Sequence, residues 1–109
     1  MTQDVEAGLP PLPPEVELAV YRIAQEALTN AVRHSACTRV RMRLAADHGA
    51  VYLRVADDGR GLGELPRSGG GIRGMRERAL MIGGRLVLGV SAEGGVEVEL
   101  CIPPAVLAA

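Results

Sequence analysis

The sequence has 109 residues, which is enough for one domain with a core of its own and too short for two. All twelve basic residues are arginine, thirteen carboxylates oppose them, and a net charge of -1 provides no positive field for nucleic acid. The chain has no Phe or Trp, so its core must be aliphatic, and no apolar run approaches the roughly 20 residues that span a bilayer.

The first 14 residues form a proline-rich segment. They contain four of the seven prolines and show no apolar period. Such a composition is typical of a linker, and we expect residues 1–14 to be an arm outside the fold. The domain itself is predicted over residues 15–109.

An amphipathic helix is predicted from Glu15 to about His34, because apolar residues recur there at steps of three and four. One stripe of this helix carries a carboxylate, an amide and two potentially cationic groups: Glu26, Asn30, Arg33 and His34. Oxygen ligands suit Mg²⁺, and positive charge suits phosphates. A solvated polar face explains the helix alone equally well.

Two strands follow the helix. "TRVRMRLA" and "VYLRVAD" alternate apolar and polar residues and are separated by the turn "ADHGA". Continuing the period of two along the second strand places Asp57 on the core side and Asp58 on the opposite side. Asp57 is therefore predicted to be a buried carboxylate at the end of a strand.

A glycine-rich segment, residues 57–74, has seven glycines among its eighteen residues. Its bare backbone suits close approach to a ligand better than core packing. A second helix is predicted over Met75–Ile82, ending at Gly83 and Gly84. Two further alternating strands, "RLVLGVSA" and "VEVELCIP", complete the order helix, two strands, glycine loop, helix, two strands.

Charged residues alternate with the apolar ones along the strands. If the strand arginines share one exposed face with Glu97 and Glu99, we expect ion pairs across strands. Cys37 and Cys101 form no CxxC pair, so both are predicted to be reduced packing residues.

Four segments carry a resemblance to a known family. "EALTNAVRHS", "DDGRGLG", "GGGIRGMRERA" and "EGGVEVELCIP" resemble, in this order, the N, G1, G2 and G3 boxes of the Bergerat-fold ATP-binding domain shared by histidine kinases, DNA gyrase and the heat-shock chaperone. "GIRGMRERA" is similar to the nitrate-sensor class of two-component sensor kinases. The resemblance spans about residues 15–103. It implies an α/β (α+β) two-layer sandwich, in which helices cover one face of a mixed, mostly antiparallel sheet.

The resemblance also implies residue roles. Asn30 would ligate Mg²⁺ with Glu26 beside it as a second metal-side or base-like group, and Asp57 would accept the exocyclic amine of adenine. Either Arg33 or His34 would face the phosphates, and the i,i+4 step from Asn30 favours His34. A lid would run from about Leu62 to Ile72 and gate the reaction. The remaining nucleotide contacts implied by the glycine boxes are Gly59, Gly61, Leu62, Gly71, Ile72, Arg73, Gly74 and Met75.

As a sensor-kinase domain, the chain would bind ATP and Mg²⁺ and pass the γ-phosphoryl group to a histidine on a dimerisation helix, from which a response regulator would receive it. Neither His34 nor His48 resembles that acceptor, so the acceptor helix is expected outside this chain. The domain would be cytoplasmic, whether or not the intact kinase is anchored in a membrane.

One residue departs from the family pattern. Val96 stands where the G3 box usually has threonine, so a hydroxyl that supports the adenine-side aspartate would be missing. Two alternatives remain open on the sequence. One is a serine kinase of the anti-sigma-factor type, and the other is a degenerate module of the same fold that only docks a partner.

Overall fold

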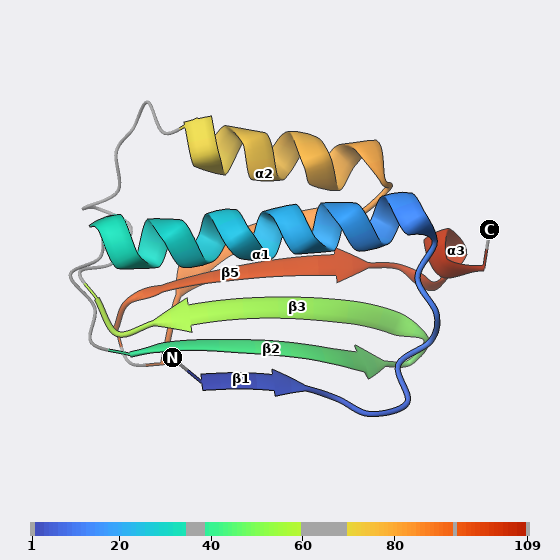
Figure 1. Cartoon of the computed structure of the whole chain (residues 1–109), viewed down its shortest axis with the longest axis horizontal. Coiled ribbons are helices and arrows are strands. Elements are labelled where there is room, and N and C mark those ends of the chain that lie inside the picture. Colours follow the sequence, from blue (N-terminus) through green and yellow to red (C-terminus); the bar gives the residue numbers. More distant parts are fainter. Residues whose placement is uncertain (1, 35–38, 60–69, 93, 109) are drawn as a thin grey trace.

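The computed structural model describes residues 2–34, 39–59, 70–92 and 94–108, and for Arg33 and His34 it describes the backbone only (Figure 1). The elements are β1 Thr2–Val5, α1 Pro14–His34, β2 Val40–Asp47, β3 Ala50–Asp57, α2 Gly70–Met81, β4 Arg85–Val90, β5 Val96–Ile102 and α3 Pro104–Leu107.

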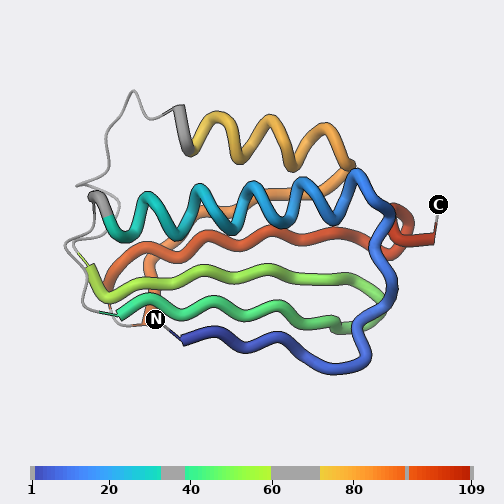
Figure 2. The backbone as a smooth tube through the Cα atoms, in the orientation of Figure 1, coloured from blue at the N-terminus to red at the C-terminus, as the bar shows by residue number. Residues whose placement is uncertain are grey.

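The strands form one mixed sheet in the order β1-β2-β3-β5-β4. β1 runs parallel to β2, and the other neighbours are antiparallel. α1 and α2 lie side by side over one face of this sheet, while α3 sits at the end of β5 (Figure 1). The tube in Figure 2 shows the chain leaving β1, passing the sheet end and entering α1. The predicted two-layer fold is therefore confirmed.

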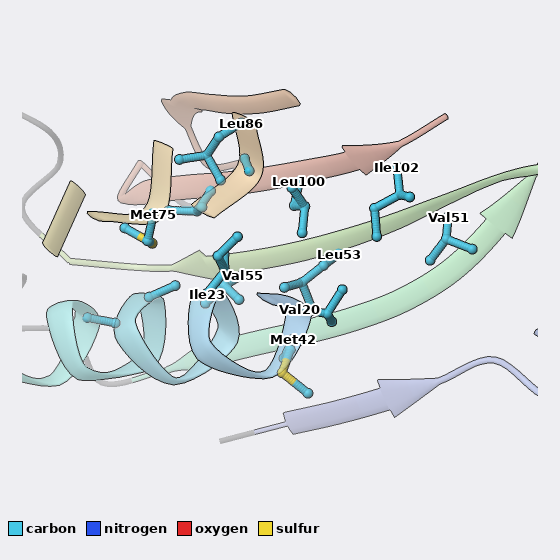
Figure 3. Packing of buried hydrophobic residues seen from close by; sticks show 14 of the residues in the cluster. Val20, Ile23, Met42, Val51, Leu53, Val55, Met75, Leu86, Leu100 and Ile102 are labelled. Atoms are coloured by element: carbon cyan, nitrogen blue, oxygen red, sulfur yellow. The ribbon is translucent and has the colours of Figure 1, made fainter. Parts of the chain in front are cut away.

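The core lies between the helices and the sheet. α1 contributes Ile23, α2 contributes Met75, and the central strands contribute Leu53 and Leu100, all at most 2 % exposed. Figure 3 shows these side chains converging from both layers. Burial alternates strictly along β5, and Val51, Leu53 and Val55 of β3 are buried at the same spacing of two, because every second residue of a strand points to the same face.

Replacing Leu53 should test this core. Leu53→Ala removes a side chain that is 2 % exposed on a central strand, and we expect it to lower the free energy of unfolding by about 2–5 kcal/mol. Leu80→Ala is the matched control, because Leu80 is 75 % exposed on α2. Urea unfolding followed by circular dichroism measures both. Equal losses in the two variants would contradict the assigned core.

The expectation that residues 1–14 lie outside the fold is wrong for β1. Thr2–Val5 pairs with Arg41–Leu44 as an edge strand. All four β1 residues are exposed, so no apolar alternation marked the strand in the sequence. Backbone pairing and surface ion pairs hold it instead, since Arg43 contacts the carboxylates of Asp4 and Glu6.

The second helix begins earlier than predicted. α2 starts at Gly70 rather than at Met75. The first turn was not predicted because it contains glycines, which have a low helix propensity. Its end at Met81, followed by Gly83 with a φ of 75°, agrees with the predicted glycine cap. The short helix α3 was not predicted.

The uncovered face of the sheet carries the charged residues. Arg54 on β3 pairs with Glu99 on β5, which confirms that ion pairs cross the strands, and this contact raises the pKa of Arg54. Cys101 is a free, half-buried thiol beside Tyr52, and its charge is the main cause that raises the pKa of the Tyr52 phenol. This face lies opposite the helices.

Candidate functional site

A pocket opens where three elements end or begin close together. The C-terminal end of α1, the end of β3 and the start of α2 meet at the left of Figure 1. Its cavity volume is about 10 Å³, within about 300 Å³ of empty space that includes open solvent at the mouth. An apolar wall with a few polar groups is typical of small-molecule sites. The lining residues are Ala27, Asn30, Ala31, Val55, Asp57, Ile72, Met75, Leu88, Val96 and Val98.

Asp57 is the buried carboxylate of this pocket. Its exposure of 4 % confirms the inward direction predicted from the strand period. Oδ1 accepts the Gly59 N–H at 2.8 Å and the Val96 N–H at 3.1 Å. Two backbone donors therefore fix the orientation of the carboxylate. Asp58 turns away and accepts the Arg39 N–H at 2.9 Å, which makes it a cap for the start of β2.

Ser91 was missed by the sequence reasoning, although it belongs to the same cluster. Its hydroxyl donates to the Asp57 carbonyl at 2.5 Å and accepts the Gly95 N–H at 3.0 Å. The Ser91 N–H also donates to the Gly95 carbonyl at 2.8 Å, closing the turn between β4 and β5. A serine three residues before a pair of glycines was the available signal, but only the tertiary structure brings it to Asp57.

Gly95 allows this turn to approach β3. A Cβ at this position would lie 2.2 Å from both the carbonyl oxygen and Oδ1 of Asp57, far closer than atoms can approach. Val96 follows directly, and its backbone N–H reaches Asp57 Oδ1. The position that lacks the usual threonine thus still supports the carboxylate, through the backbone, and places an apolar side chain in the pocket wall.

The polar stripe of α1 lies only partly in the pocket. Asn30 lines it together with Asp57, whereas Glu26 is half-buried one turn earlier and is not among the lining residues. The backbone of Arg33 and His34 forms the end of α1, but their side chains lie outside the described residues. His48 is a turn residue as predicted, with a φ of 52° between β2 and β3.

The first turn of α2 faces the same end of the molecule. Gly71, Ile72 and Arg73 fall in this turn, where backbone N–H groups have no partner within the helix. Ile72 and the fully buried Met75 line the pocket. The Arg73 side chain instead contacts Glu77 at 3.0 Å, and Gly74 lies beside Arg78. A helix N-terminus at a pocket mouth is suited to anions.

Several predicted features lie outside the described residues: Gly61, Leu62, the lid up to residue 69 and Cys37. Of the expected lid, residues 70–72 belong to α2. In the ranges that the structure describes, no three His, Cys, Asp or Glu side chains cluster as a metal cage. The same ranges contain no helix that is both long and apolar enough to cross a membrane.

Comparison with known proteins shows the family of this chain. The model of the histidine kinase-, DNA gyrase B- and HSP90-like ATPases matches residues 15–106. The chain belongs to this ATPase family. ATP binding is the property that membership implies, and the pocket of Asp57 and Asn30 lies within the matched range.

Among relatives, the chain is 38 % identical to the sensor histidine kinase YxjM of Bacillus subtilis (strain 168) over 84 % of its own length and 22 % of that protein. It is 37 % identical to the sensor histidine kinase LiaS of the same strain, over 81 % of its own length and 25 % of that protein. In this ATPase family the chain therefore corresponds to the ATP-binding catalytic domain of sensor histidine kinases. It spans about a quarter or less of the length of these relatives.

A solved histidine kinase structure has a similar fold. The histidine kinase domain of the blue-light activated histidine kinase EL346 of Erythrobacter litoralis superposes with a TM-score of 0.75 at 26 % identity, covering 95 % of this chain and 55 % of that one. Together with the sensor kinases above, it favours the histidine-kinase interpretation over the serine-kinase alternative within this ATPase family.

Proposed function

We propose that this domain binds Mg-ATP in the pocket of Asp57 and Asn30 and donates the γ-phosphoryl group to a histidine on a separate dimerisation domain. The observation that carries the proposal is the buried Asp57 carboxylate, held by two backbone N–H groups in a largely apolar wall. Such a carboxylate can accept a hydrogen bond from an amine that lies in the plane of a flat base. Adenine presents that amine, and the apolar wall suits its ring faces.

The donor set fits magnesium. Asn30 offers an amide oxygen in the pocket, and Glu26 offers a carboxylate one turn earlier on α1. Mg²⁺ keeps several waters and uses one or two protein oxygens beside the phosphates, so it needs no cage. When bound, the ion would neutralise charge on the β- and γ-phosphates. Asn30 is the principal ligand in this assignment.

The other groups position the triphosphate. The first turn of α2 would direct the N–H groups of Gly71, Ile72 and Arg73 at phosphate oxygens. During transfer, the bond from the γ-phosphorus to the bridging oxygen breaks, a bond to the histidine nitrogen forms, the imidazole loses a proton and ADP leaves. The domain's part is orientation and charge neutralisation rather than covalent chemistry. One of Arg33 and His34 would add positive charge at this end.

The partners follow from the same assignment. The acceptor histidine would come from a dimerisation domain outside the 109 residues, and a response regulator would take the phosphoryl group from it. His48 is not a candidate acceptor, since it lies in the β2–β3 turn with its ring against Asp47. We place the domain in the cytoplasm, where ATP is available.

Asn30→Ala tests the magnesium assignment. Wild-type protein should bind ATP more tightly with Mg²⁺ than with EDTA. In the variant, this gain in affinity from Mg²⁺ should be smaller by about tenfold or more, because the metal loses its protein oxygen. Isothermal titration calorimetry under both conditions measures it.

Gln25→Ala is the control for this experiment. It removes an exposed amide from the same helix and should leave the effect of Mg²⁺ on ATP affinity unchanged. An Asn30→Ala protein that responds to Mg²⁺ like the wild type would remove Asn30 from the metal site. If the wild type itself binds no ATP, the degenerate docking alternative would hold.

A further inference from the structure

Within the described residues, two polar side chains are buried: Asp57 at 4 % and Ser91 at 5 % exposure. They come from segments 34 positions apart, and the Ser91 hydroxyl donates a hydrogen bond to the backbone carbonyl of Asp57. Asp57 has a place in the proposed nucleotide site. Ser91 is not a lining residue of the pocket, and the family resemblance gave it no role.

The Ser91 hydroxyl forms a bridge between two strands of the sheet. It donates to the carbonyl of Asp57 at the end of β3 and accepts the N–H of Gly95 just before β5. The next residue, Val96, donates its N–H to Oδ1 of the same aspartate. The hydroxyl thus holds both the backbone of Asp57 and the turn that supplies one of its carboxylate donors.

We propose that Ser91 is a positioning residue for recognition of the nucleotide base, acting through Asp57. This inference rests on the proposed function, since it concerns the same pocket. Without the hydroxyl, the Gly95 N–H and the Asp57 carbonyl lose a buried partner, and the register of Val96 against Oδ1 is no longer fixed. The Asp57 carboxylate then presents its oxygens to the base in a less defined orientation.

The effect should be specific to the base. Asp57 would contact the exocyclic amine of adenine, whereas the triphosphate lies at Asn30 and the start of α2. Inosine triphosphate carries the same triphosphate but has a carbonyl oxygen in place of the amine, which a carboxylate repels. The ratio of ATP to inosine triphosphate affinity therefore reports the orientation of Asp57 separately from the rest of the site.

Calorimetric titration of the 109-residue chain with the two nucleotides and Mg²⁺ tests this inference. Wild type should prefer ATP by at least about tenfold. Ser91→Ala should lower that preference roughly five- to tenfold, the value of about one buried hydrogen bond, while affinity for inosine triphosphate stays nearly unchanged. If the role of Ser91 were merely structural, the substitution would weaken the binding of both nucleotides equally.

The double variant Asp57→Asn/Ser91→Ala completes the cycle. If Ser91 acts through Asp57, then Ser91→Ala should have almost no further effect on the ATP preference once Asp57→Asn has removed the charge. Additive losses, or an unchanged preference in Ser91→Ala, would overturn the inference while leaving ATP binding in place. Absence of ATP binding by the wild type would overturn the proposed function and this inference together.

Ser91→Ala could fail to fold, and Ser91→Cys guards against this outcome. The thiol is close in shape and retains only a weak S–H donor, so it should lower the ATP preference in the same direction. A folded Ser91→Cys protein with wild-type preference would also count against the role assigned to the hydroxyl.

Discussion

Asp57→Asn should weaken ATP binding by about 10- to 100-fold, which corresponds to the loss of one hydrogen bond to a charged group. The asparagine side-chain oxygen can still accept the N–H groups of Gly59 and Val96, so the loop should keep its conformation. What disappears is the negative charge that would face the adenine amine. Calorimetry gives the affinity, and circular dichroism shows that the variant is folded.

Asp58→Asn is the control for that variant. It makes the same chemical change one residue later, where the carboxylate accepts the Arg39 N–H and lies outside the pocket lining. ATP affinity should stay within about twofold of the wild type, as for a substitution away from the site. Equal losses in the two variants, or full affinity in Asp57→Asn, would show that Asp57 does not contact the base.

Gly95→Ala should have the second large effect. The added Cβ would lie 2.2 Å from two atoms of Asp57, so the turn must move away from β3. We expect a loss of about 1–3 kcal/mol or more in the free energy of unfolding. We also expect a loss of ATP affinity of at least about tenfold, because Val96 and Ser91 can no longer hold Asp57. Thermal unfolding and calorimetry measure the two effects.

Gly89→Ala provides the matched comparison. Gly89 lies on the neighbouring strand β4, and a Cβ there would meet nothing within 4 Å. Stability should change by less than about 0.5 kcal/mol, and ATP binding should be unaffected. If Gly95→Ala behaved like Gly89→Ala, the close approach of the β4–β5 turn to Asp57 would be wrong.

The sequence predicted the parts of this structure that depend on local periodicity. Apolar spacing located α1, and alternation located four strands and the inward direction of Asp57. Period and burial are linked directly, because a residue's place in the repeat decides which face it occupies. The Arg54–Glu99 pair followed from the same reasoning.

The parts that were missed depend on tertiary contacts or on weak local signals. β1 has no apolar face, so nothing in residues 2–5 distinguished it from a linker. The first turn of α2 is rich in glycine, which favours a loop on propensity alone. Ser91 and Gly95 became recognisable only when the turn between β4 and β5 was found against Asp57.

The location of the nucleotide can be measured most directly by NMR. A ¹⁵N-labelled chain of 11.4 kDa, titrated with Mg-ATP, should show saturable shift changes in the backbone amides of Gly59, Ile72 and Val96 and in the side-chain amide of Asn30. Unchanged spectra at millimolar Mg-ATP, or changes confined to Tyr52 and Arg54 on the uncovered sheet face, would contradict an ATP site between α1, β3 and α2.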